Sequence, residues 1–545
     1  MTYFVADYLI ERLAQNGVEA LFGIPAVYCA AVYDAAARAP GFRTVATNSD
    51  LEAGYAADGY ARVRGLSAVA VSYGPGTLSM VNAIAAAYAE RSPVVVVNGG
   101  PLQTDIDNQN TTGVLFSHSL GQPHTDMDIF RNVTTFCERA DSVGAIPQLV
   151  DSAIAAALVG KRPVYIEIPH GFLDEPCPQP VGAIDVTVPA GAADAVAGSI
   201  LQELATAANP LVIVGEEVQR YGLADTTLAV LDRLQLQWTT TLVAKSVLPE
   251  SHPRFLGVFN GDEASAPVKN LVRSAGLIVA LGAVFGSQYA HLMIPKVNAT
   301  IRAWDGGVVS HGGAPQAVGL PALLDALDQQ SAGASPVVYT PVVAGPVAAP
   351  PVPAGPDLEY QQVFDVVAEP AFLDGSLTVI ADTFLGIYPA AQIPMPAQDS
   401  FITDGLWSSI GHSIGAAIGA FEGGRRPLVL IGDGGFQTVG QAISTMVRHQ
   451  HNSIVIIIDN SLYGYEQFLE GQGFYTNPAQ PPLPYNVLAD WNFEAFARAL
   501  GVTQVATVNA AAALRTALAT AKAHTTGPSV ICAQVPSRSL PAGLL

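Results

Sequence analysis

Residues 428–466 read LVLIGDGGFQTVGQAISTMVRHQHNSIVIIIDNSLYGYE, and this stretch decides the fold of the chain around it. The apolar run 428–431 meets a glycine-rich turn, a helix-like segment follows, and a second apolar run, 454–458, ends in Asp459-Asn460. This order predicts strand, turn, helix and strand. In a parallel sheet both strands end at the same edge, where open α/β sheets bind ligands.

The turn between the two strands is suited to a diphosphate carried on a divalent cation. Its glycines let the backbone approach a ligand closely, and the amides that open the following helix add the positive end of a helix dipole. These glycines are Gly432, Gly434 and Gly435. Asp433 offers a carboxylate, Asn460 an amide oxygen and Leu462 a backbone carbonyl, which together with phosphate oxygens match the octahedral oxygen set of Mg²⁺.

The spacing of these residues carries a family resemblance. G-D-G, then 25 residues, then Asn460 resembles the thiamine-diphosphate (ThDP) signature, and G-D-G-x-x-Q-x-x-x-Q-x-I-S-T-M is similar to the 2-oxo-acid decarboxylases, pyruvate and indolepyruvate decarboxylase among them. The resemblance implies ThDP and Mg²⁺ as cofactors and an α/β fold of three doubly wound parallel-sheet domains. It also implies at least a homodimer, and we expect a homotetramer, with active sites at the subunit interfaces.

Length and composition agree with a large, well-buried assembly. A chain of 545 residues is too long for one core and favours three domains. Its net charge of −21 disfavours a nucleic-acid backbone or an anionic membrane as partner.

The four cysteines have no C-x-x-C spacing, so neither a zinc site nor a disulfide framework is indicated. The N-terminus predicts an amphipathic helix, not a signal peptide, and we expect a soluble cytoplasmic protein.

Alternating short apolar runs and alanine-rich segments predict the domains. Residues 1–180 form a pyrimidine-binding domain, with strands at 18–22, 44–46, 68–72, 94–97 and 164–168. Residues 185–335 form a central domain, with strands at 210–214, 237–240 and 277–281; it lacks G-x-G-x-x-G and is predicted to be a spacer. Residues 336–357 are a proline-rich linker. Residues 358–545 form the diphosphate-binding domain, with strands at 377–380, 428–431, 454–458 and 529–534.

A second fingerprint lies in the segment 47–62, TNSDLEAGYAADGYAR. In the family it resembles, a Glu nine positions before the Gly of D-G-Y-A-R bonds to N1′ of the aminopyrimidine and promotes the loss of the C2 proton that yields the ylid. Counting back nine from Gly59 gives Asp50, one methylene shorter. Either the backbone lies closer, or a water bridges the gap, or ylid formation is slow. Glu52 is an alternative, but it would point to a different side of the helix, so we favour Asp50. Asp50 could also cap this helix.

Further motifs complete the cofactor fingerprint. The loop 73–79, YGPGTLS, with the following Asn82, resembles the pyrimidine side of the family's site, so we expect Gly74, Gly76 and Asn82 to bind the cofactor. The run 405–411, GLWSSIG, resembles L-W-G-S-I-G. The resemblance implies that Ile410 holds the cofactor in its bent shape and that the Ser408 carbonyl accepts from the 4′-amino group. Thr383 is expected on the diphosphate side.

The residues expected beside the thiazolium depart from the family. Related decarboxylases carry an Asp before a Tyr, an adjacent His-His pair, and a Glu six residues after the metal-binding Asn. Here Val27 replaces the Asp, Ser117-His118 replaces the pair, and Glu466 is retained. Glu466 and His118 are therefore the candidate proton-transfer pair.

The favoured activity is decarboxylation of a 2-oxo acid, a small-molecule substrate, to an aldehyde through an enamine. Because the acid at Val27 is lost and Asp50 is short, the alternative is an acyloin carboligase or lyase that uses an acceptor aldehyde or ketone. A catalytically silent paralogue and an FAD-containing, acetolactate-synthase-like enzyme are further, less favoured alternatives.

Overall fold

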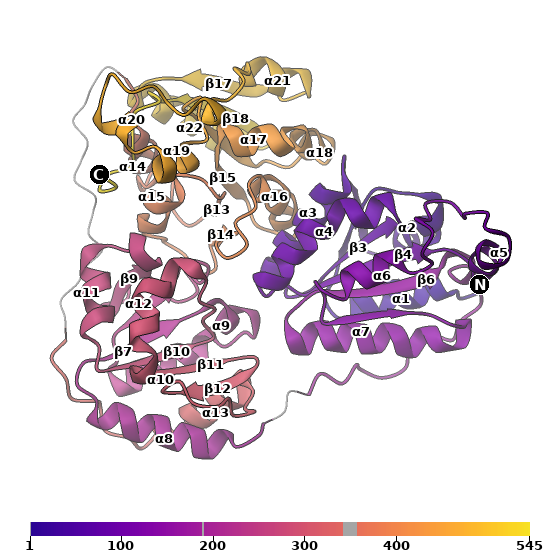
Figure 1. The fold of residues 1–545 in the computed structure, drawn as a ribbon, viewed down its shortest axis with the longest axis horizontal. Helices are drawn as coiled ribbons and strands as arrows, with labels where there is room; N and C mark the ends of the chain where they lie inside the picture. The colour runs from indigo at the N-terminus through magenta and orange to yellow at the C-terminus, as the bar shows by residue number, and fades with distance from the viewer. Residues whose placement is uncertain (1, 188–189, 342–356) are drawn as a thin grey trace.

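The computed structural model describes residues 2–187, 190–341 and 357–545. Three six-stranded sheets, each covered by helices, follow one another along the chain (Figure 1). All strand pairs are parallel except β11 with β12, which are antiparallel. The prediction of three doubly wound α/β domains is confirmed. Residues 342–356 of the predicted linker lie outside the described residues.

The first sheet has the order β2-β1-β3-β4-β6-β5. The elements of this domain are α1 (Val5–Gln15), β1 (Ala20–Gly23), α2 (Ala30–Arg38), β2 (Arg43–Ala46), α3 (Asp50–Arg64), β3 (Ser67–Ser72), α4 (Pro75–Ala89), β4 (Val94–Gly100), α5 (Gln103–Thr112), α6 (Thr125–Phe130), β5 (Phe136–Arg139), α7 (Ile146–Gly160) and β6 (Val164–Pro169). Its central strands are fully buried runs, as expected for a parallel sheet covered on both faces.

The second sheet has the order β12-β11-β10-β7-β8-β9. Its elements are α8 (Ala193–Thr206), β7 (Pro210–Val214), α9 (Glu216–Arg220), α10 (Ala224–Leu234), β8 (Trp238–Thr241), β9 (Phe255–Phe259), α11 (Ala266–Ser274), β10 (Leu277–Leu281), α12 (Ala290–Met293), β11 (Thr300–Trp304), β12 (Gly307–Ser310) and α13 (Leu320–Ser331). The strand order reverses between β7 and β10, but there the loops after the two strands touch: a Cβ on Gly215 would lie 2.1 Å from Ala283 Cα. This close contact is possible because residue 215 is glycine.

The third sheet has the order β14-β13-β15-β16-β18-β17. Its elements are α14 (Tyr360–Val367), β13 (Thr378–Ala381), α15 (Ile387–Gln392), β14 (Phe401–Thr403), α16 (His412–Glu422), β15 (Pro427–Gly432), α17 (Asp433–Val439), α18 (Ile443–Arg448), β16 (Ile454–Asp459), α19 (Gly464–Glu470), α20 (Gly473–Thr476), α21 (Phe493–Ala499), β17 (Gln504–Val508), α22 (Ala511–Ala523) and β18 (Ser529–Gln534). The strand, turn, helix and strand predicted for 428–466 are β15, α17 with α18, and β16.

Helices α3 and α16 join the first and third domains of one chain (Figure 1). Glycines allow the two backbones to touch: a Cβ on Gly419 would lie 1.8 Å from the carbonyl oxygen of Ala56, and one on Gly59 would lie 2.2 Å from that of Ala416. Any larger residue at these two glycines would therefore push the helices apart.

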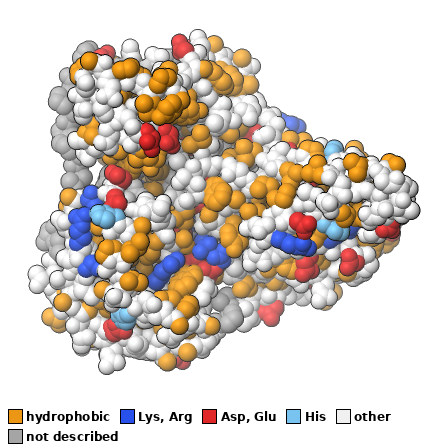
Figure 2. Space-filling model, in the orientation of Figure 1, with side chains coloured by type: hydrophobic (Ala, Val, Ile, Leu, Met, Phe, Trp, Pro, Cys, Tyr) orange, Lys and Arg blue, Asp and Glu red, His pale blue; other side chains and the backbone are white. Residues whose placement is uncertain are grey.

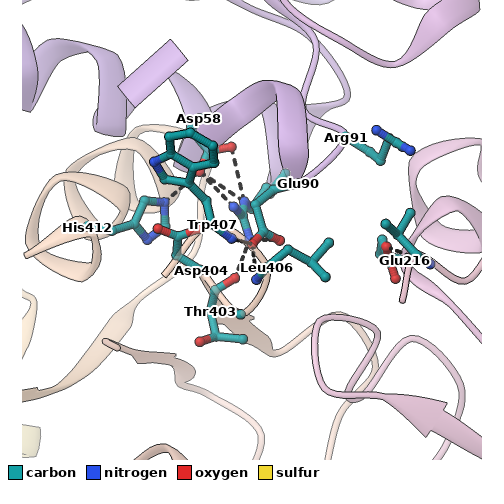
Figure 3. A network of polar contacts seen from close by, with 12 residues as sticks. Asp58, Glu90, Arg91, Glu216, Thr403, Asp404, Leu406, Trp407 and His412 are labelled. Atoms are coloured by element: carbon teal, nitrogen blue, oxygen red, sulfur yellow. Dashed lines mark hydrogen bonds and ion pairs between the residues drawn. The ribbon is translucent and has the colours of Figure 1, made fainter. Parts of the chain in front are cut away.

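A buried polar network lies at the same contact (Figure 3). Asp58 is fully buried, accepts from the guanidinium of Arg62 and lies 2.6 Å from His412 Nε2. Arg62 Nη1 also donates to the carbonyl of Thr403 at 2.6 Å. Because Thr403 ends β14, this network fixes the start of the loop 404–411 relative to the first domain.

One segment, Val143–Gly160, is long and apolar enough by length and composition to cross a membrane. Its helix α7 is amphipathic: Ile146, Val150 and Ile154 are buried in the core of the first domain. Asp151 in the middle of the helix pairs with Arg12 of α1 at 2.8 Å. This packing is that of a helix covering the sheet of its own domain.

Candidate active site in two halves

A cavity of about 340 Å³ opens at the carboxyl ends of β13, β15 and β16. Every third-domain residue that the sequence singled out for the site lines it: Thr383, Ser408, Ile410, Gly432, Asp433, Gly434, Gly435, Asn460, Leu462 and Glu466. The aromatic side chains of Phe384, Tyr463 and Tyr465 form part of its wall. This is the edge of a parallel sheet at which open α/β folds bind ligands.

The oxygens at the base of the cavity are held by backbone amides. Asp433 is 2% exposed; its Oδ1 accepts from Gly434 N at 2.9 Å and its Oδ2 from Ser461 N at 2.7 Å. Asn460 Oδ1 accepts from Leu462 N at 3.2 Å. Burial and the neighbouring Asp459 raise the pKa of Asp433 to about 8. A buried carboxylate next to a second one favours a bound cation, which would restore its charged form.

The donor set fits a magnesium diphosphate better than a metal held by protein alone. Among the described residues there is no group of three or more His, Cys, Asp or Glu side chains that could hold a metal. Asp433, Asn460 and the Leu462 carbonyl supply only oxygens, and Mg²⁺ bound through few carboxylates takes its other ligands from water and phosphate. A Cβ on Gly434 would lie 2.5 Å from the ring of Tyr463, so the turn requires glycine there.

The loop 404–411 brings Ser408 and Ile410 to the cavity. Its backbone is fixed at both ends, because Asp404 Oδ2 accepts from Ser409 N at 2.7 Å and Asp382 Oδ1 accepts from Gly411 N at 3.0 Å. Ser408 has a φ of +64°. Ile410, which lines the cavity, is 39% exposed.

Two first-domain residues of the same chain also hold this loop. Glu90, at the end of α4, accepts from Leu406 N at 2.6 Å and from Trp407 N at 3.2 Å (Figure 3). Asn82 accepts from the Trp407 indole at 2.9 Å and donates to Ser409 Oγ at 2.8 Å. The sequence singled out Asn82 as a cofactor ligand; the structure places its side chain against the loop that carries Ser408 and Ile410.

Asp50 lies in the first domain, away from the cavity. It is the first residue of α3, and the N-cap is Ser49, whose side chain accepts from Glu52 N at 3.1 Å. The alternative that Asp50 caps this helix is therefore wrong. Asp50 Oδ1 is 3.5 Å from the position of a Cβ on Gly76, and burial raises its pKa to about 6. Glu52 points elsewhere, with its carboxylate 3.1 Å from Asn48 N.

His118 lies against Gly74 in the same domain. A Cβ on Gly74 would be 2.6 Å from His118 Cβ, and the ring centroids of Tyr73 and His118 are 5.4 Å apart. Val27 is 84% exposed, and Ser117 is exposed as well. Asp50, His118, Gly74 and Gly76 thus gather around one turn, but His118 and Glu466 do not meet within one chain.

The candidate site therefore has two halves on one chain: the cavity in the third domain, and the Asp50 and His118 region in the first. Apolar side chains are exposed near each half, and Figure 2 shows hydrophobic side chains on the visible surfaces of both domains. Near the first half they are Val27, Val114, Leu115 and Leu120; on the third domain they include Trp407, Ile410, Leu469 and Tyr485. Exposed apolar clusters of this kind mark contact surfaces.

Comparison with known proteins gives matches to all three domains. Residues 4–124 match the thiamine pyrophosphate enzyme N-terminal TPP binding domain, residues 198–302 its central domain, and residues 386–533 its C-terminal TPP binding domain. An alpha-keto-acid decarboxylase of Mycobacterium tuberculosis is 33% identical over 92% of this chain and 88% of its own. One of Mycolicibacterium paratuberculosis is 31% identical, with the same coverage. A pyruvate decarboxylase of Hanseniaspora uvarum is 28% identical over 89% of this chain and 86% of its own.

Proposed function

The chain belongs to the ThDP-dependent 2-oxo-acid decarboxylase family, and we propose that its two half-sites together decarboxylate a 2-oxo acid to the aldehyde with ThDP held on Mg²⁺. One observation carries the proposal: the diphosphate-side residues expected from the sequence converge on one cavity at the sheet edge. When bound, ThDP supplies the nucleophilic carbon and the electron sink of the reaction.

The residues of the cavity divide into binding and proton-transfer groups. Asp433, Asn460 and the Leu462 carbonyl would hold Mg²⁺, and the amides of Gly434 and Gly435 would face the diphosphate. Glu466, exposed in the first turn of α19, lines the cavity and would act on the substrate as a general acid or base.

The residues of the first domain would complete the reaction from a second subunit. Asp50 would hold a proton at N1′ of the pyrimidine, and His118 would work with Glu466 to deliver the proton that replaces the departing carboxylate. Because Asp50 and His118 lie outside the cavity of their own chain, we propose a homodimer, or a tetramer built from such dimers, in which each cavity faces the first domain of a partner.

The test is product analysis. Pyruvate and longer 2-oxo acids are incubated with the protein, ThDP and Mg²⁺, with and without an acceptor aldehyde, and carbon dioxide, aldehyde and acyloin are quantified. We expect equal amounts of carbon dioxide and aldehyde. Carbon dioxide accompanied by acyloin in place of aldehyde would contradict the decarboxylase proposal and support carboligation. The observation that favours carboligation is that position 27 carries an exposed valine in place of an acid. No carbon dioxide from any 2-oxo acid would defeat both.

A further inference from the structure

Asp126 is a buried carboxylate that the sequence did not single out. It lies in the first turn of α6 and is 8% exposed. Its Oδ2 accepts from Gly74 N at 2.7 Å and from the hydroxyl of Thr77, which is fully buried. Within the described residues no basic side chain pairs with it, so these two donors, at the N-terminus of α4, satisfy its buried oxygen.

The segment that Asp126 holds is the turn 73–77, which leads from β3 into α4. Gly74 is the N-cap of α4, with φ +74° and ψ −111°, a conformation that only glycine adopts readily. Because glycine is the most permissive residue, this conformation depends on its hydrogen bonds: the amide donates to Asp126, and the carbonyl accepts from Leu78 N at 2.9 Å and from Thr77 Oγ1 at 3.2 Å.

The same turn separates the two candidate catalytic side chains of the first domain. On one side Gly74 packs against His118, since a Cβ placed on this glycine would lie 2.6 Å from His118 Cβ; on the other side, Gly76 lies next to Asp50 Oδ1. A shift of the turn would therefore move His118 or leave a gap beside Asp50. Misplacing a catalytic group by about 1 Å costs on the order of 10²-fold in rate.

We infer that Asp126 is a positioning residue: by binding Gly74 N and Thr77 Oγ1 through one oxygen, it fixes the turn 73–77 between Asp50 and His118. The inference rests on the proposed function, since it concerns the same site. It assigns to Asp126 no contact with substrate or cofactor. Its role is to fix the conformation of the turn 73–77, against which Asp50 and His118 both pack.

Three variants test this inference. Asp126→Ala leaves the buried Gly74 N without its acceptor, and it leaves the Thr77 hydroxyl with only the Gly74 carbonyl, 3.2 Å away, to donate to. Asp126→Asn is the matched control, because both hydrogen bonds end on Oδ2 and an amide oxygen can accept both. Thr77→Val removes the hydroxyl at nearly constant shape, and with it the bonds to Asp126 and to the Gly74 carbonyl. It tests the inference even if the alanine variant folds poorly.

Two readouts separate positioning from simple stabilisation. In the cofactor-free protein, amide hydrogen exchange of the turn 73–77 should rise about tenfold or more in Asp126→Ala and stay near wild type in Asp126→Asn. With saturating ThDP and Mg²⁺, C2-proton exchange and kcat should fall roughly 10- to 100-fold in Asp126→Ala with KM nearly unchanged, and Asp126→Asn should stay within about threefold of wild type. Thr77→Val should fall between them.

Two results would overturn the inference. One is an Asp126→Ala protein that melts earlier but exchanges the C2 proton at the wild-type rate, since Asp126 would then only stabilise the fold. The other is an asparagine variant as impaired as the alanine variant. Failure of the proposed function has a different signature, namely a wild-type protein that exchanges the C2 proton no faster than free ThDP.

Discussion

Replacing Asp50 tests which carboxylate serves the cofactor. Asp50→Asn keeps the shape of the side chain but can neither hold nor release a proton, so the C2-proton exchange of bound ThDP should fall by about 10²- to 10⁴-fold, the usual contribution of a positioned acid or base. Asp50→Glu restores the length found in the family. Since the carboxylate already lies against Gly76, with 3.5 Å from Oδ1 to a Cβ placed there, the longer side chain has to extend away from Gly76.

The assay is deuterium exchange at C2, stopped by acid and read by NMR, with each variant saturated with ThDP and Mg²⁺. We expect Asp50→Glu to exchange at least as fast as wild type and Asp50→Asn to be the slowest. Glu52→Gln is the control, because Glu52 points to Asn48 and not to Gly76. The reasoning is refuted if Asp50→Asn exchanges at the wild-type rate, or if Glu52→Gln is the variant that loses exchange.

Three further predictions concern binding and stability. Gly434→Ala places a methyl group 2.5 Å from the Tyr463 ring, so the affinity for ThDP with Mg²⁺, measured by calorimetry, should fall at least about tenfold with the fold retained; unchanged affinity would contradict this. Asp58→Asn removes the nearer carboxylate of the buried Arg62 and leaves Glu90, 3.9 Å away, as its acidic partner, so it should cost about 3–5 kcal/mol in denaturant unfolding; a loss under about 1 kcal/mol would show that the Asp58–Arg62 ion pair is dispensable. Burial raises the pKa of Glu52 from 4.5 to about 7, so between these values the folded state binds more protons than the unfolded state and stability falls as pH rises. Glu52→Gln lacks this titration, and its unfolding free energy relative to wild type should rise by up to about 3 kcal/mol from pH 4.5 to pH 7; a pH-independent difference would argue against a buried, titrating Glu52.

Most strands inside the sheets could be predicted from the sequence, whereas β11 and most edge strands, including the buried β9 and β14, could not. Strands β7, β10 and β18 have the predicted bounds, because strands covered on both faces are continuous apolar runs. The sheet edges β5 and β17 contain polar, half-exposed residues. Such strands lack a clear alternation of apolar and polar residues, so the sequence does not reveal them. They form by pairing with the neighbouring strand of the sheet.

The candidate site could be predicted where its residues follow one another along the chain. The turn 432–435 and Asn460 belong to one strand-helix-strand unit, so spacing alone brings them together. Asp126 and Glu90 have no such signal, because their partners Gly74 and Leu406 are remote in sequence. The ion pair between Asp58 and Arg62 did have a signal in the sequence, because an acidic and a basic residue lie four positions apart on a helix.

The central claim is that one active site is built from the first domain of one subunit and the third domain of another. It is tested most directly by co-expressing Asp50→Asn and Asp433→Ala chains with different tags and purifying the mixed dimer through both. Each parent variant should be inactive, whereas the mixed dimer has one intact site out of two and should recover about half of the wild-type decarboxylase activity. A mixed dimer as inactive as its parents would contradict the account, because each site would then lie within a single chain.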